Sequence, residues 1–286
     1  MTSKKIKIIT DSVADIPQNL LDKWNIDVVP CYVNYGGESY SDDGVELDRA
    51  HFFNYIKNNN EVPTTAAPSP GLAEEIVGKA IEGYDHLISV NVAESLSATF
   101  NNVLLACNTV DKERTTVLDS ESVSMGIGWL ALIAAEVAAE TGDVDAVVKA
   151  VENVKKNHRL FAGIYDMTYL RRSGRVNAVV ASIGSLLQIK PIVQVIEKGE
   201  VISAHRVRTF KKVITKLRDL LEEESGQLDR IAIIHTANED GAKKFIEDNK
   251  DILPDETIIA EVGPTLGTHI GPDCLGFVSV NKAWRA

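Results

Sequence analysis

The sequence predicts an α/β protein with two units, a parallel doubly wound unit over residues 1–156 and a mixed α/β unit over residues 157–286. In the first unit, four short apolar runs alternate with segments of helical periodicity, which is typical of a parallel sheet. After residue 157 the pattern changes to a hairpin joined to further strands and helices. The charge changes with it: residues 1–156 hold 12 Lys and Arg against 24 Asp and Glu, and residues 157–286 hold 18 against 17.

The first unit contains four expected strands, separated by helices. The strands are Ile6–Thr10, Val28–Val33, Leu87–Val92 and Thr115–Leu118. Capping residues or prolines mark the starts of the helices between them. These starts lie at Asp15 to Pro17, at Asp48, at Ser69-Pro70 and just before Phe100. The segment Met125–Ala139 is almost entirely apolar, which predicts a buried helix, and a helix from Val144 to about Asn157 completes the unit.

The second unit combines a hairpin with further strands, which indicates a mixed sheet. The hairpin joins Ile189–Val195 to Val201–Ala204 through a turn at residues 198–200. The other expected strands are Arg230–His235, Thr257–Val262 and Leu275–Val280, and the expected helices run from about Thr209 to Leu221 and over Asp240–Asn249. A further helix over Val176–Leu187 is apolar on nearly all sides but rich in Ala, Gly and Ser. We therefore expect it to be deeply buried or to border a cavity.

The composition excludes several classes of protein. A net charge of −11 argues against nucleic acid as a general partner. The first residues enter a strand without the apolar stretch of a signal peptide, and no apolar run is as long as a membrane span. The 3 cysteines are scattered, and the 6 histidines form no zinc-binding pattern. We therefore expect a cytoplasmic protein with reduced thiols and no metal.

Polar residues gather where three of the expected parallel strands end. These residues are Thr10–Ser12, Ser95–Thr99 and Asp119–Ser120. Because the carboxyl ends of parallel strands share one edge of a sheet, these side chains should lie on the edge where α/β proteins bind ligands. Ser97 is expected at the N-cap of the following helix, just before the free N–H groups of Ala98 and Thr99. Its hydroxyl therefore either caps the helix or contacts an anionic ligand.

Six short motifs follow one another in the order found in a family of bacterial proteins. They are Thr10-Asp11-Ser12, Pro63–Ser69, Leu96–Thr99, Tyr169–Arg175, Ile189-Lys190-Pro191 and Thr268–Asp273. Together they extend over nearly the whole chain, and on them the sequence resembles the DegV family of fatty-acid-binding proteins. The resemblance implies two α/β/α domains with a long-chain fatty acid buried in a tunnel between them.

The resemblance also implies a carrier rather than an enzyme. Proteins of this kind are similar to subunits that present a bound acyl carboxylate to an ATP-dependent partner kinase, which phosphorylates it to acyl-phosphate for phospholipid metabolism. On this interpretation Thr65, Ser97 and the N–H of Ala98 donate hydrogen bonds to the carboxylate, and His269 and Arg175 form the polar surroundings. The fatty acid is the expected ligand, and no cofactor is expected.

Two further groups of residues have expected roles. Within the small-residue helix, Ile183, Gly184 and Leu187 are expected to border the acyl chain. Arg206 and Arg208 alternate on an extended segment inside a band, residues 159–216, with 11 basic and 3 acidic residues. We expect these two arginines to dock the partner kinase through its carboxylates. An anionic membrane competes for the same charges, so transient membrane contact is an alternative use of them.

The chain departs from the family pattern at several positions near the expected head-group site. Ala66 and Ala67 replace Ser and Gln, which removes two polar side chains beside Thr65. Ala98 replaces a Gly, so the backbone there is less free to adopt a positive φ. Asp273 replaces the last Gly of the motif that contains His269. These departures bear on the head-group contacts and the preferred acyl chain more than on the fold.

Two other functional classes are weighed against the carrier. A serine-dependent acyl hydrolase or transferase would use Ser97 as nucleophile and His269 as base. The residues around Ser97 do not form the Gly-x-Ser-x-Gly motif, however, and no third member of a triad is evident. A nucleotide-binding protein would need a Gly-rich phosphate loop after a strand, and the sequence has none. If ATP is used, we expect the partner to bind it.

Overall fold

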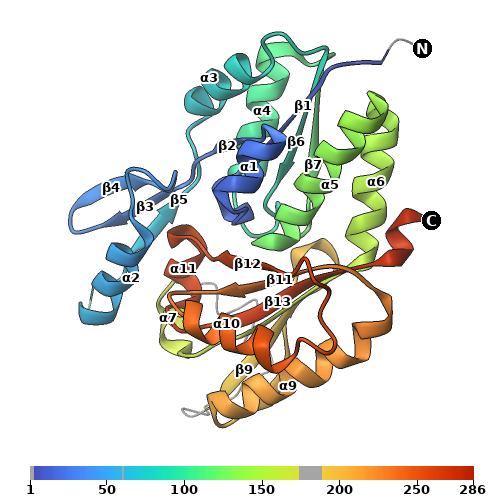
Figure 1. The fold of residues 1–286 in the computed structure, drawn as a ribbon. Coiled ribbons are helices and arrows are strands. Elements are labelled where there is room, and N and C mark those ends of the chain that lie inside the picture. The colour runs from blue at the N-terminus through green and yellow to red at the C-terminus, as the bar shows by residue number, and fades with distance from the viewer. Residues whose placement is uncertain (1–2, 60, 174–188) are drawn as a thin grey trace.

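The computed structural model describes residues 3–59, 61–173 and 189–286. In Figure 1 the N-terminal half of the chain lies above the C-terminal half, and each half has its own central sheet. The predicted helix Val176–Leu187 lies outside the described residues, and so do Arg175, Ile183, Gly184 and Leu187. The structure contains a parallel sheet and a mixed sheet, which confirms the α/β class predicted from the alternation of apolar runs.

A four-stranded parallel sheet forms the centre of the N-terminal half, as predicted. Its strands, in spatial order, are β2 (Asp27–Val29), β1 (Ile6–Asp11), β6 (His86–Asn91) and β7 (Thr115–Asp119). All neighbouring pairs are parallel. Every residue of β6 is buried, because this strand has a neighbour on each side and helices above and below it.

Helices cover both faces of this sheet. On one face, α3 (Pro70–Ala80) and α4 (Thr99–Asp111) pack their apolar side chains on Ile9, Val29 and Leu87. The other face carries α1 (Gln18–Trp24), α5 (Met125–Thr141) and α6 (Val144–Asn157). Helix α5 contacts β1 and α6, and also β13 (Leu275–Asn281) of the C-terminal half. It is buried between the two halves, which confirms the burial predicted from its apolar composition.

A small antiparallel sheet projects from the N-terminal half (Figure 1). Its strands, in order, are β4 (Glu38–Ser41), β3 (Tyr32–Tyr35) and β5 (Thr64–Ala66), and the apolar side chains of α2 (Arg49–Asn58) pack on it. The prediction of one strand over Val28–Val33 was wrong here, because this segment divides into β2 and the start of β3. Pro30 divides the segment because proline has no N–H for the ladder. The N–H of Cys31 is donated to the Ser12 hydroxyl at 3.0 Å.

The C-terminal half contains a six-stranded mixed sheet. Its strands, in spatial order, are β10 (Val201–Val207), β9 (Lys190–Val195), β8 (His158–Gly163), β13, β11 (Leu228–His235) and β12 (Ile258–Glu261). Only the β11–β12 pair is parallel among the pairs of this sheet. Helices α9 (Phe210–Glu224) and α10 (Glu239–Asp248) cover one face, and the other face turns toward the N-terminal half.

Three elements of the C-terminal half were not predicted. Strand β8 starts at His158, directly after α6 ends at Asn157, so no turn residues in the sequence indicate where the strand begins. Helix α11 (Pro264–Ile270) occupies a stretch where no helix was predicted, and the short helix α7 (Met167–Arg172), also not predicted, contacts it. Pro264 stands at the first turn of α11, where its missing N–H costs nothing. With 7 residues, α11 is too short for a helical period to stand out in the sequence.

The candidate ligand cavity

A largely apolar cavity of about 1010 Å³, including its opening to solvent, lies between the two halves. Its walls come from the six-stranded sheet, from β5, from α7 and α11, and from loops that follow strands of the parallel sheet. The apolar residues that line it are Val13, Val92, Leu96, Val123, Leu160, Ala162, Ile164, Leu170, Val193, Val195, Val201, Ile234, Val262, Leu266 and Ile270. The polar ones are Thr65, Ser97, Ser124, Thr265 and His269. The apolar lining with few polar groups is typical of a small-molecule site.

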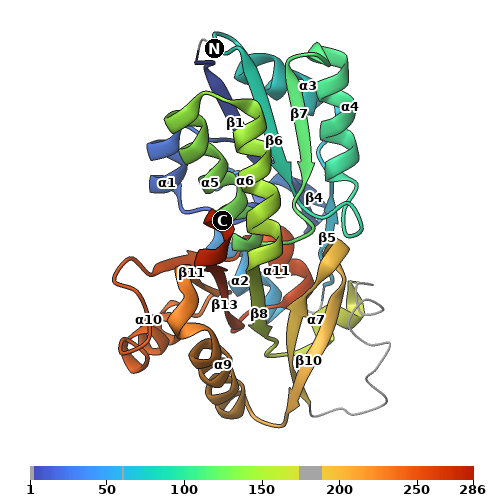
Figure 2. The same ribbon diagram turned by 90° about the vertical axis from the view of Figure 1, so that its right-hand side faces the viewer.

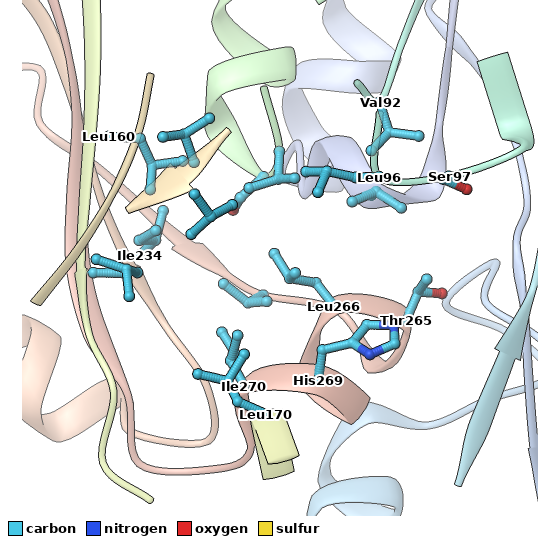
Figure 3. Close-up of a pocket in the computed structure, with 18 of the residues that line it drawn as sticks. Val92, Leu96, Ser97, Leu160, Leu170, Ile234, Thr265, Leu266, His269 and Ile270 are labelled. Atoms are coloured by element: carbon cyan, nitrogen blue, oxygen red, sulfur yellow. The ribbon is translucent and has the colours of Figure 1, made fainter. Parts of the chain in front are cut away.

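Thr65, Ser97 and His269 line this cavity from three different elements. Thr65 belongs to β5, Ser97 to the loop before α4, and His269 to α11. The Thr65 hydroxyl and Nε2 of His269 are 3.1 Å apart and form a hydrogen bond. Figure 3 shows Ser97 and His269 on opposite walls at one end of the cavity, and Leu160 and Ile234 at the other end. The motifs thus identified residues that the fold brings around one cavity.

The Ser97 hydroxyl lies one residue before the N-cap, so its prediction as the cap itself was wrong. Helix α4 starts at Thr99, and Ala98 holds the N-cap position. The reason is a turn at 93–97, in which the Ala93 carbonyl accepts the N–H groups of Leu96 and Ser97. Ser97 Oγ still accepts the N–H of Thr99 at 3.2 Å and lies 2.9 Å from the Thr99 hydroxyl.

The backbone at Ala98 shows whether alanine is strained where the family pattern has glycine. Its φ is −68° and its ψ is −6°, in the ordinary right-handed region. An alanine therefore fits this turn without strain, and glycine is not required there. Asp273 is the opposite case, because its φ of +64° lies in the left-handed region. Its carboxylate accepts a hydrogen bond from Lys57 at 2.9 Å.

Helix α11 is packed closely against the N-terminal half. A Cβ atom at Gly267 would lie 2.6 Å from the ring of Phe53 on α2, so only glycine allows this approach. The close packing puts His269 beside β5, although the two belong to different halves of the chain. The position of α11 therefore determines the geometry at the polar end of the cavity.

Two buried aspartates beside the cavity were not recognised in the sequence as site residues. Asp15 was interpreted as part of a helix start, but α1 begins at Gln18 after Pro17, and Asp15 turns inward instead. Burial raises the pKa of Asp15 to about 7. Asp42 follows β4 and is also buried, which raises its pKa. Neither has a local sequence signal, because each interacts with residues more than 100 positions away.

The basic residues expected to dock a partner lie on the β9–β10 hairpin. Arg206 and Arg208 are exposed, and in the hairpin register Arg206 pairs with Pro191. They lie at the end of the hairpin opposite its tip. At the tip, the Lys198 carbonyl accepts a hydrogen bond from Ser95 at 2.8 Å. Figure 2 shows the tip reaching the N-terminal half.

The described residues contain neither a metal-binding cluster nor a membrane-spanning helix. No cluster of three or more histidine, cysteine, aspartate or glutamate side chains there is arranged to hold a metal ion. No helix in residues 3–59, 61–173 and 189–286 has both the length and the apolar character needed to cross a membrane.

The fold and the cavity together define an α/β protein with a parallel sheet in one half, a mixed sheet in the other and a largely apolar cavity between the two halves. A family model described as an uncharacterised protein of the DegV family matches residues 5–282. The chain belongs to the DegV family. It is 33% identical to Protein DegV of Bacillus subtilis over 275 residues, which cover 95% of this chain and 97% of that one.

Solved structures of relatives have the same fold. The crystal structure of DegV, a fatty acid binding protein from Bacillus subtilis, is 32% identical with a TM-score of 0.89 over 98% of this chain and 100% of that chain. A DegV family protein from Thermus thermophilus, whose structure is described as showing fatty acid binding, is 28% identical with a TM-score of 0.88. That match covers 97% of this chain and 99% of the other.

Proposed function

We propose that this protein binds a long-chain fatty acid in the cavity between its domains. The observation that carries the proposal is the cavity itself, a largely apolar space with hydroxyl and imidazole groups of Thr65, Ser97 and His269 at one end. A fatty acid has the matching chemistry, a long apolar tail and one anionic end. Relatives from Bacillus subtilis and Thermus thermophilus are described as fatty-acid-binding proteins, which supports the same ligand class here.

The acyl tail supplies most of the affinity on this proposal. Burying ~14 methylene groups at ~0.8 kcal/mol each contributes roughly 11 kcal/mol before the cost of association. A hydrogen bond to a carboxylate adds only about 1.5–3 kcal/mol. The polar end therefore fixes the position of the carboxylate rather than the strength of binding. Ile183, Gly184 and Leu187 are proposed to extend the tail site.

At the polar end, the hydroxyls of Thr65 and Ser97 and the N–H of Ala98 are proposed to donate to the carboxylate. Nε2 of His269 lies at hydrogen-bond distance from the Thr65 hydroxyl, so His269 fixes the direction in which that hydroxyl points. Arg175 is proposed to add positive charge near the same end. These residues bind and orient the carboxylate, and none of them needs to transfer a proton.

The proposed role of the bound fatty acid is that of a substrate for a partner kinase. In that reaction a carboxylate oxygen bonds to the γ-phosphorus of ATP. The bond from the γ-phosphorus to the oxygen that bridges to the β-phosphorus breaks, and ADP leaves with that oxygen. The partner supplies ATP and catalysis, and this chain supplies a positioned carboxylate. The exposed Arg206 and Arg208 are proposed to dock the partner.

The alternative of a serine-dependent acyl hydrolase receives less support from the geometry. The hydroxyl that hydrogen-bonds Nε2 of His269 is that of Thr65. The Ser97 hydroxyl instead contacts the hydroxyl and N–H of Thr99. A nucleophilic serine would need the histidine as its base at that distance.

Native mass spectrometry of the protein purified from a bacterium tests the ligand class directly. We expect a released mass in the range of long-chain fatty acids, at about one per chain. Delipidated protein should then bind a long-chain fatty acid in a calorimeter and should not hydrolyse acyl esters. A different co-purified ligand, or no binding of any fatty acid, would overturn the proposal, and turnover of an ester would favour the hydrolase.

A further inference from the structure

Two carboxylates of the N-terminal domain reach across the domain interface to the start of α11. One oxygen of Asp15 accepts the N–H of Gly263 at 2.7 Å. One oxygen of Asp42 accepts the N–H of Thr265 at 3.0 Å, and it also accepts the Thr265 hydroxyl. The pairs are separated by 248 and 223 positions in the chain, so these contacts exist only when the two domains are closed on each other.

These contacts supply the hydrogen-bond acceptors that the start of α11 lacks in its own sequence. The N-cap of α11 is Gly263, which has no side chain to accept a hydrogen bond from the first turn. The first N–H groups of any helix need acceptors from elsewhere. Here the acceptors are the carboxylates of Asp15 and Asp42, which belong to the other domain. The start of α11 is therefore completed by the domain that it faces.

Helix α11 in turn forms one wall of the cavity. Its residues Thr265, Leu266, His269 and Ile270 line that wall. The second oxygen of Asp15 accepts a hydrogen bond from the hydroxyl of Ser124 at 2.6 Å, and Ser124 also lines the cavity. One carboxyl group of Asp15 thus links α11 to Ser124.

Ser124 shows that this junction is tightly determined. Its φ of +51° with a ψ of −143° is a conformation that serine rarely adopts, and its side chain is fully buried. Such strain persists only where the surrounding structure enforces it, and it concentrates at ligand sites. The strained residue therefore marks the junction between α5, Asp15 and the cavity.

We propose that Asp15 and Asp42 are positioning residues that hold α11 closed over the cavity, and that breaking their contacts to α11 sets the rate of ligand exchange. This inference rests on the proposed function for its ligand, a fatty acid. The clamp itself, defined as the contacts of Asp15 and Asp42 with Gly263 and Thr265, is a property of the protein without ligand.

The charges around the clamp give it a direction of pH dependence. The positive charge next to Asp15 and Asp42 is that of Arg49 from α2. The other titratable groups near Asp42 are Asp11 from β1, Cys31 and Asp43. Those near Arg49 are His235 from β11 and Glu261 from β12. Arg49 favours the charged form of both clamp residues, but burial outweighs it, and the pKa of each is raised. When the domains separate, water reaches Asp15, and its pKa returns toward the ordinary value of 3.8.

Opening therefore releases a proton from Asp15 between about pH 4 and its closed-state pKa of about 7. A process that releases a proton becomes more favourable as the pH rises through that window. Ligand exchange should accelerate with pH up to about 7 and level off above it. The limit is about tenfold per pH unit for one proton.

The test is stopped-flow displacement of a fluorescent long-chain fatty acid at pH 6 and pH 7.5. We expect the wild-type rate to rise several-fold over this interval. Asp15→Asn carries no charge at either pH, so its rate should vary much less. Titration of the fatty acid itself occurs in both proteins and cancels in the comparison.

Two substitutions at Asp42 separate positioning from charge. Asp42→Ala removes the acceptor for Thr265, and we expect displacement at least tenfold faster. Asp42→Asn keeps a carbonyl acceptor and should restore most of the wild-type rate at pH 7.5. If Asp42→Ala does not fold, Thr265→Val removes only the hydroxyl contact and should give a smaller acceleration.

Glu136→Gln is the matched control. Glu136 on α5 also forms a contact between the two halves, because its carboxylate accepts a hydrogen bond from Arg230 of β11 at 2.6 Å. That partner belongs to β11 and not to α11. This variant should lower the melting temperature without changing the pH profile of displacement. A wild-type displacement rate in Asp42→Ala, or a full pH profile in Asp15→Asn, would overturn the clamp.

Hydrogen exchange of the ligand-free protein separates this inference from the proposed function. In Asp42→Ala the amides of residues 263–270 should exchange at least tenfold faster than in the wild type. If the wild type binds no fatty acid, the proposed function fails, and the exchange result still decides whether the clamp exists.

Discussion

The hydroxyl of Thr65 and Nε2 of His269 lie 3.1 Å apart, although 204 positions separate them in the chain. The contact joins β5 of the N-terminal domain to α11 of the C-terminal domain at one end of the cavity. A ligand at that end would touch both domains at once. Affinity, position of the carboxylate and closure of the domains are therefore linked, and separate substitutions can test each of them.

The hydroxyls at the polar end should contribute modestly to affinity. Ser97→Ala and Thr65→Val should each weaken fatty-acid binding by roughly 1–3 kcal/mol, because the tail still binds. Phosphorylation by the partner kinase should fall further, since it depends on the position of the carboxylate. Calorimetry measures the first effect. Ser95→Ala is the control, because its hydroxyl donates to Lys198 outside the cavity lining. Wild-type affinity in both site variants would count against this end as the head-group site.

The length of the tail site should depend on the small residues of the helix expected over 176–187. Gly184→Phe should shorten the longest acyl chain that the protein accepts, because the ring occupies space beside the tail. Binding of a series of fatty acids of increasing length measures this limit. Gly226→Phe is the control, since a Cβ at Gly226 meets nothing within 4 Å. An unchanged length limit in a folded Gly184→Phe protein would contradict the tunnel assignment.

The exposed arginines of the hairpin should affect the partner and not the ligand. Arg206→Ala or Arg208→Ala should leave fatty-acid binding intact and slow partner-dependent phosphorylation. The slowing should be larger at low salt, where charge attraction is least screened. Lys244→Ala removes an exposed cation from α10 and serves as the control. A wild-type rate of phosphorylation in the double arginine variant would place the docking surface elsewhere.

Stability should fall as the pH rises through the acidic range. Burial raises the folded-state pKa of Asp15 from 3.8 to about 7, so the folded protein holds a proton there that the unfolded chain has lost. The free energy of unfolding then decreases between about pH 4 and pH 7. Denaturant titrations of Asp15→Asn should show a shallower decrease. Asp11, with a pKa raised to about 6, supplies part of the slope that remains. An identical pH profile in the two proteins would show that Asp15 ionises freely.

The left-handed backbone at Asp273 should favour glycine over alanine. Asp273→Ala keeps the φ of +64° and loses the contact with Lys57, so it should be less stable than Asp273→Gly by about 1 kcal/mol. The lost ion pair is half-exposed and contributes about 0–1 kcal/mol in both variants. Urea denaturation of the pair measures the difference. Equal stability of the two would mean that the backbone relaxes at this position.

Elements with a local signal can be predicted from the amino-acid sequence alone. Three strands of the parallel sheet, β1, β6 and β7, coincide with predicted apolar runs, and the buried helix α5 coincides with an apolar segment of the right length. The motifs also named Thr65, Ser97 and His269, which the fold brings around one cavity. Their role in binding a ligand stays a prediction, and so do the domain boundary at 156/157 and the roles of Arg175, Ile183, Gly184 and Leu187.

The contacts between positions far apart in the sequence depend on how the sheets pack against each other. Asp15 resembled an ordinary helix start in the sequence, yet in the fold both Asp15 and Asp42 accept hydrogen bonds from the start of α11. Pro30 ended one strand and sent the chain into a second sheet, which carries Thr65 to His269. The physical reason is that periodicity and capping depend on neighbours a few residues away. The partners of a buried carboxyl or hydroxyl depend instead on how two separately formed sheets dock, and no local pattern encodes that.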